Sequence, residues 1–127
     1  MTAFLHVCIG GALGSGARYL VSLWALRTLP IGFAWGTFFV NAIGSLLLGF
    51  VVQFALDTNA LSPNARLFLT TGCMGGFTTY STFNQETIAL VQQGAHGLAL
   101  VNVLATVATC FVAGFAGVSL ARVVAGG

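Results

Sequence analysis

Thr70–Phe83 reads TTGCMGGFTTYSTF. This stretch lies in the middle of a longer segment, residues 64–92, that is long enough to cross a membrane. Glycines and hydroxyl side chains are much more frequent in it than in an ordinary lipid-facing helix. The sequence therefore predicts a membrane segment whose centre differs from the usual apolar span.

The rest of the chain is apolar. Of its 127 residues 57% are hydrophobic and 5% are charged, whereas soluble domains carry about 25% charged residues. A span needs roughly 20 apolar residues, so the chain has room for about four spans and little else. We expect an all-α integral membrane protein in the lipid bilayer, with one domain over residues 1–127. The predicted spans are residues 3–26, 33–56, 64–92 and 98–124.

Composition also excludes several functions. A net charge of +2 is too small for a nucleic-acid footprint. The chain has no lysine and hence no Walker A motif, and its single aspartate, Asp57, lies in a predicted loop, so neither a nucleotide-binding loop nor a Ser/His/Asp triad can be built. We expect no enzymatic activity.

The arginines are balanced between the two faces of the predicted bundle. Arg66 and Arg122 fall on the side of the termini, and Arg27 and the deeper Arg18 toward the other. The positive-inside rule then gives no preferred orientation. Two orientations of one chain can assemble as a closed antiparallel pair, so dual topology is a hypothesis from the sequence.

The pairs Gly75-Gly76 and Thr78-Thr79 mark the point where the third span is expected to break, because glycine lowers the cost of leaving helical geometry. Carbonyl groups freed in a bilayer must line a cavity, meet protein donors or coordinate a cation. The alternative is that the glycines only allow close helix packing.

Aromatic and hydroxyl side chains follow this point. Tyr80 and Phe83 share one helical face, with Ser81 and Thr82 on neighbouring faces. Ring edges are positive and hydroxyls donate hydrogen bonds, so the group suits a small anion. Aromatic packing with hydroxyls bonded to their own helix is the alternative interpretation.

Two other spans contain polar residues. Asn41 is at the middle of the second, and its carboxamide can donate two hydrogen bonds to an anion. In the fourth, Asn102, Thr106, Thr109 and Cys110 follow helical spacing. Hydrogen bonding between helices explains this stripe almost as well as a pore.

Arg18 and Glu86 are the charged residues expected within spans, where charge is expensive and often functional. Arg18 can draw anions into a vestibule or simply extend to the membrane surface. Glu86 can assist or gate ion entry, and an exposed carboxylate at a helix end is the comparable alternative.

The run from Thr70 to Glu86 closely resembles TTGxxGGxTTFSTFSxE, the signature of the Fluc (CrcB) fluoride channels, and residues 36–41 resemble their GTLxVN stretch. The resemblance implies an antiparallel homodimer with two pores in a bacterial inner membrane, exporting fluoride passively. It implies pore roles for Asn41, Tyr80 and Phe83 and for the hydroxyls of Ser81 and Thr82. It also implies a structural, untransported sodium ion held by the backbone carbonyls of Gly75 and Thr78.

The chain departs from that signature at Tyr80, where the family usually has phenylalanine, and at Asn84, where serine is usual. The Tyr80 hydroxyl either narrows the pore or adds a ligand. The strongest competing function is a small multidrug-type, proton-coupled antiporter, which needs a carboxylate deep in the first span, where this chain has Arg18. A non-transporting structural subunit is a third possibility, for which no ion flux is expected.

Overall fold

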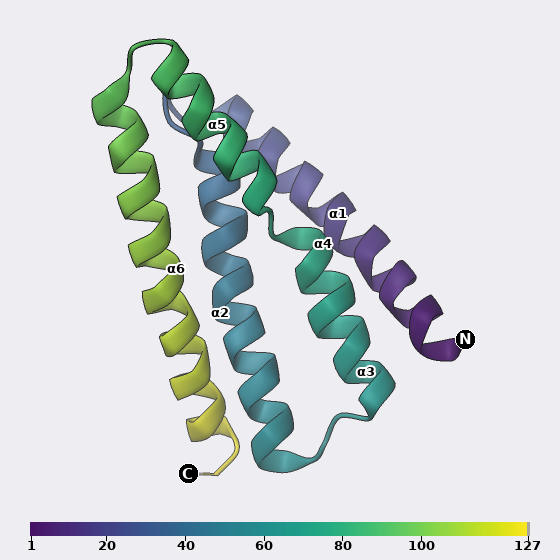
Figure 1. The fold of residues 1–127 in the computed structure, drawn as a ribbon. Helices are drawn as coiled ribbons and strands as arrows, with labels where there is room; N and C mark the ends of the chain where they lie inside the picture. Colours follow the sequence, from purple (N-terminus) through teal and green to yellow (C-terminus); the bar gives the residue numbers. More distant parts are fainter. Residues whose placement is uncertain (127) are drawn as a thin grey trace.

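The computed structural model describes residues 1–126, which form a bundle of helices (Figure 1). The elements are α1 (Thr2–Thr28), α2 (Trp35–Thr58), α3 (Pro63–Leu67), the π-helix η1 (Phe68–Met74), α4 (Gly75–Phe77), α5 (Tyr80–Gln92) and α6 (His96–Val124). Three of these, α1, α2 and α6, are long and apolar enough to cross a membrane. The predicted all-helical fold is confirmed.

The remaining membrane segment is divided. Elements α3, η1 and α4 follow one another, and α5 begins only after two residues of extended backbone, Thr78 (φ −79, ψ 159) and Thr79 (φ −153, ψ 116). The sequence predicts a break around the glycine and threonine pairs. The structure places it at the threonine pair, whereas Gly75 and Gly76 remain helical in α4.

The start of this segment follows its capping residues. Ser62 is the N-cap of α3, and its Oγ accepts a hydrogen bond from the N–H of Ala65 at 3.2 Å. Pro63 takes the first helical position, where its missing N–H costs nothing. The segment therefore begins at a fixed residue after the α2–α3 loop.

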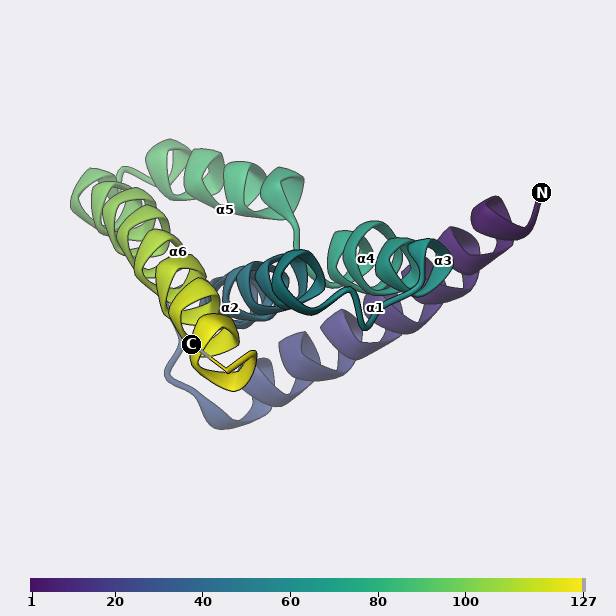
Figure 2. The ribbon, with the colours of Figure 1, turned by 90° about the horizontal axis from the view of Figure 1, so that it is seen from below.

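The break moves the third segment from one neighbour to another. Before it, η1 and α4 pack mainly against α1, and after it, α5 packs mainly against α6. Seen from below, α3 and α4 lie beside α1 while α5 lies on the α6 side, with α2 between the two groups (Figure 2). The residues at the break consequently lie along α2 and face α6.

Helices α2 and α6 form the most extensive contact in the fold, and a small residue permits it. A Cβ atom at Gly117, which is buried in α6, would overlap the carbonyl oxygen of Leu46 in α2. Helices in membranes use such small residues to bring their backbones together. The α2–α6 pair is therefore held at a fixed, short separation.

We expect Gly117→Ala to destabilise the protein by about 1–3 kcal/mol, because the new methyl group must push backbone apart. The matched control is Gly97→Ala at the start of α6, where an added Cβ meets nothing within 4 Å. Thermal unfolding in detergent measures both. Equal melting temperatures for the two variants would show that the close approach at Gly117 does not exist.

Candidate functional site

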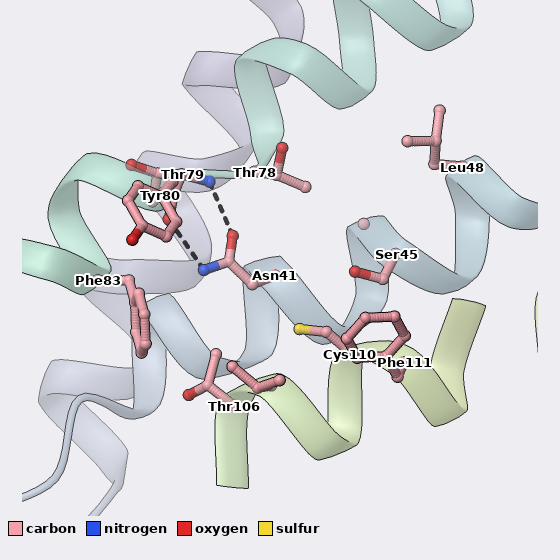
Figure 3. Close-up of a pocket in the computed structure, with 12 residues that line it drawn as sticks. Asn41, Ser45, Leu48, Thr78, Thr79, Tyr80, Phe83, Thr106, Cys110 and Phe111 are labelled. Atoms are coloured by element: carbon pink, nitrogen blue, oxygen red, sulfur yellow. Dashed lines mark hydrogen bonds between the residues drawn. The ribbon is translucent and has the colours of Figure 1, made fainter. Parts of the chain in front are cut away.

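A cavity of about 440 Å³ lies at the break. Its walls come from α2, the extended residues, the start of α5 and the middle of α6 (Figure 3). The lining residues are Asn41, Gly44, Ser45, Leu48, Thr78, Thr79, Tyr80, Phe83, Thr106, Val107, Cys110 and Phe111. No lining residue carries a charge, so this is an uncharged, partly polar cavity among apolar helices.

Asn41 holds the extended backbone in place. Its Nδ2 donates to the carbonyl oxygen of Thr79 at 2.9 Å, and its Oδ1 accepts from the N–H of Thr79 at 2.8 Å (Figure 3). The carboxamide oxygen thus supplies the acceptor that the N–H of Thr79, which lies outside the helices, would otherwise lack. An amide nitrogen carries two N–H groups, so one of the two donors expected for an anion is used by Thr79 and one remains.

Thr79 also fixes the start of α5. Its hydroxyl oxygen accepts from the N–H of Thr82 at 3.3 Å, which caps the helix. The cap places Tyr80 in the first turn of α5 and Phe83 one turn further, with ring centroids 5.8 Å apart. Tyr80 is 77% exposed, whereas Phe83 is 9% exposed, so Phe83 forms the inner wall and Tyr80 the rim.

Thr106 supplies an unused donor on the α6 side. Its side chain is 5% exposed, and its buried hydroxyl has no hydrogen-bond partner within residues 1–126. Buried polar groups are nearly always paired, so an isolated hydroxyl on a cavity wall favours a ligand or water there. Figure 3 shows Thr106 on the same side of the cavity as Phe83.

A second cavity of about 380 Å³ lies between α5 and the α1–α2 connection, and Glu86, Thr37, Thr82 and Trp35 are among its lining residues. The hydroxyl of Thr37 donates to Glu86 Oε1 at 2.8 Å. Glu86 Oε2 and Trp35 Nε1 are buried without partners in residues 1–126. The carboxylate is therefore oriented by Thr37, and its second oxygen is buried without a partner in a residue that lines the cavity.

The predicted site residues divide between these cavities. Asn41, Tyr80, Phe83 and Thr106 come together in the first, and Thr82 and Glu86 lie at the second. Three others line neither of the two: Ser81, Thr109 and Arg18. Ser81 is exposed on α5, and Arg18 is half-buried on α1.

The carbonyls of Gly75 and Thr78 have lost their usual helical donors. In a continuous helix they would accept from Thr79 and Thr82. Those N–H groups instead donate to Asn41 Oδ1 and to the Thr79 hydroxyl. Within residues 1–126 no cluster of His, Cys, Asp or Glu side chains could hold a metal ion, so a cation here would need backbone oxygens.

Sequence reasoning missed the part that Thr79 plays. The signal was present, because a carboxamide in a span needs partners and an extended residue nearby is the natural one. Thr87, which hydrogen-bonds Asn102 across helices at 2.9 Å, was also missed. The sequence analysis named Asn102 as a polar residue of the fourth span. Spacing within one helix does not show which residue of a neighbouring helix completes its hydrogen bond.

Apolar helices, a broken segment and an uncharged polar cavity at the break define a multi-pass integral membrane protein.

The chain matches the family described as "CrcB-like protein, Camphor Resistance (CrcB)" over residues 5–118. It is also similar to proteins named "Fluoride-specific ion channel FluC". The relative from Anaeromyxobacter sp. (strain K) is 54% identical over 99% of this chain and 100% of its own length. The one from Rhizobium meliloti (strain 1021) is 45% identical over 96% and 98%, and that from Clostridium perfringens (strain 13 / Type A) is 40% identical over 94% and 93%. The chain belongs to the CrcB family.

Proposed function

We propose that this protein is a fluoride channel that lets fluoride leave the cytoplasm passively across the bacterial inner membrane. The observation that carries the proposal is the cavity at the break, where uncharged donors and aromatic rings meet inside a membrane segment. The names of its relatives support the same function. Uncharged walls favour passage over tight binding, since a conducted ion must also leave each site.

Named groups can replace part of the hydration shell of the ion. The remaining N–H of Asn41 and the unpaired hydroxyl of Thr106 are hydrogen-bond donors on the cavity wall. The positive ring edges of Tyr80 and Phe83 add a weak attraction for an anion. Glu86 and Thr37, at the second cavity, are proposed to act at the entrance.

An antiparallel homodimer would complete the pathway. Gly75 and Tyr80 flank the break, at the starts of α4 and α5, and both are exposed in the single chain. A second copy would cover them. The equal division of arginines between the two faces supports insertion in both orientations. A C-terminal reporter that is detected on only one side of the membrane would contradict this arrangement.

A structural sodium ion fits the break. The carbonyl oxygens of Gly75 and Thr78, freed from the helical ladder, would hold it, since oxygen ligands suit such a hard cation. It would supply positive charge that keeps these carbonyls satisfied within the bilayer.

Efflux from proteoliposomes tests the function. Vesicles that contain purified protein and fluoride should release fluoride to an electrode once a potassium ionophore balances the charge, and chloride-loaded vesicles should release little. Release of a lipophilic cation driven by a proton gradient would instead indicate an antiporter. Absence of any flux would indicate a structural subunit, and either outcome refutes the proposal.

We expect Tyr80→Phe to raise the rate of fluoride efflux about two- to tenfold, the effect of losing one hydrogen bond of roughly 0.5–1.5 kcal/mol. A donor at the rim deepens a well that the ion must leave, so its removal should speed passage. Tyr19→Phe is the matched control, because Tyr19 is an exposed tyrosine on α1. Slower efflux from Tyr80→Phe would show that the hydroxyl assists conduction.

A further inference from the structure

Asn102 is a buried carboxamide that the cavities do not explain. It lies in α6, is 1% exposed, and is absent from the lining of both cavities described above. An amide inside a membrane segment is expensive unless it has partners. Its Nδ2 donates to the hydroxyl oxygen of Thr87 in α5 at 2.9 Å.

Thr87 in turn forms a hydrogen bond with the backbone of Phe83. Its hydroxyl donates to the carbonyl oxygen of Phe83, one turn earlier in α5, at 2.8 Å. The hydroxyl is therefore both acceptor and donor, and its orientation is fixed. Within residues 1–126, the bond from Asn102 is the single side-chain hydrogen bond that joins α5 to α6.

Thr87 in α5 and Asn102 in α6 each lie one helical turn from a residue that lines the cavity. Phe83 precedes Thr87 by four residues and Thr106 follows Asn102 by four, so both lie on the same faces as the bonded pair. Phe83 and Thr106 line the cavity. A shift of α5 along or around α6 would change the distance between the Phe83 ring and the Thr106 hydroxyl.

At its other end α5 is held by Thr79, which Asn41 binds. Phe83 lies between Thr79 and Thr87, and its apolar side chain can form no hydrogen bond to α6. Apolar contacts alone tolerate sliding in a bilayer, because lipid is as apolar as the neighbouring helix. The hydrogen bond supplies the direction and register that apolar contacts lack.

We propose that Asn102 and Thr87 are a positioning pair that holds Phe83 against Thr106 and so sets the width of the ion pathway. This inference rests on the proposed function for its consequence, which is discrimination between fluoride and the larger chloride ion. Asn102 acts through Thr87 and does not bind the ion, because it lies off the cavity. Loss of the pair lets α5 move and admits chloride.

The test compares the ratio of fluoride to chloride efflux for Thr87→Val, Thr87→Ser, Asn102→Leu and the double variant Thr87→Val/Asn102→Leu. Thr87→Val keeps the shape but removes the hydroxyl, and it should lower the ratio about fivefold or more, the equivalent of one hydrogen bond. Thr87→Ser keeps the hydroxyl and should retain the wild-type ratio. The double variant should be no worse than the single ones, since both remove the same bond.

An unchanged ratio in Thr87→Val would overturn the proposal. So would a double variant whose loss is the product of the two single losses, because Asn102 would then act independently of Thr87. If Thr87→Val does not assemble, Thr87→Ala carries the same prediction.

A second readout needs no ion flux. Cys110 lines the cavity one turn beyond Thr106, so its rate of maleimide labelling, measured with Cys8 and Cys73 replaced by alanine, reports access to that wall. Thr87→Val should speed labelling and Thr87→Ser should not; equal rates would refute the positioning role. Failure of wild-type fluoride efflux would refute the proposed function alone, because the labelling result stands apart from it.

Discussion

Replacement of Asn41 by aspartate is expected to reduce fluoride efflux from proteoliposomes about a thousandfold. A unit charge about 4 Å from an anion costs about 4 kcal/mol at an effective dielectric constant of about 20, and each 1.4 kcal/mol is about tenfold in rate. The carboxylate would also lose the N–H that Asn41 donates to Thr79 and would place an oxygen against that carbonyl. Electrode recordings on vesicles of equal protein content measure the loss.

The control for this variant makes the same chemical change outside the bundle. Asn59 lies in the loop after α2 with a left-handed backbone (φ 53), a conformation that aspartate tolerates. Asn59→Asp should conduct as the wild type does. Gel filtration should show the same assembly for both variants, and near-normal efflux by Asn41→Asp would remove Asn41 from the pathway.

Replacement of Phe83 by isoleucine is expected to reduce fluoride efflux at least about tenfold, and to leave assembly intact. Isoleucine has similar bulk to fill the inner wall, but it has no ring edge to stabilise an anion, and a loss of about 1.4 kcal/mol suffices for a tenfold effect. The side chain is 9% exposed and contacts the cavity. The same electrode measurement applies.

Phe4→Ile is the matched control, since Phe4 is exposed on α1 and belongs to neither cavity described here. It should leave efflux unchanged. Equal rates for Phe83→Ile and wild type would mean that the ring serves only to pack α5, and that the ion passes elsewhere.

The helical architecture was predictable because a bilayer demands it. Apolar runs of span length must be helical, since every backbone group needs a partner in lipid, and glycine with hydroxyl side chains marked the segment that is not an ordinary span. The position of the break was less predictable. The sequence predicted a break around the glycine and threonine pairs, and glycine was the reason for it. The structure keeps Gly75 and Gly76 helical and opens the helix at the threonine pair, where Asn41 hydrogen-bonds Thr79.

The π-helix η1 over Phe68–Met74 was not predicted at all. Its residues have no distinctive spacing, and a wider helical turn depends on packing: Gly72 in η1 lies so close to Gly10 in α1 that an added Cβ would be 3.0 Å from its Cα. Such contacts join segments far apart in the sequence. The sequence alone does not show which of these segments pack against each other.

The residue types of the candidate site were more predictable than the contacts that these residues make with other helices. Polar residues in spans are rare enough to be noticed, and Asn41, Phe83 and Thr106 do share a cavity. Helical spacing grouped Thr109 with Thr106, but it lies off that cavity, because the direction of a helix face depends on its neighbours. The bond from Thr37 to Glu86 joins two helices and required the fold.

The reversal potential of the current in a planar bilayer measures fluoride selectivity most directly. With a tenfold fluoride gradient and equal chloride on both sides, a passive fluoride pathway predicts reversal at about 59 mV, the value for one charge per tenfold ratio. A current that reverses at zero, or that follows a proton or chloride gradient instead, would contradict fluoride conduction through the cavity at Thr78 and Thr79.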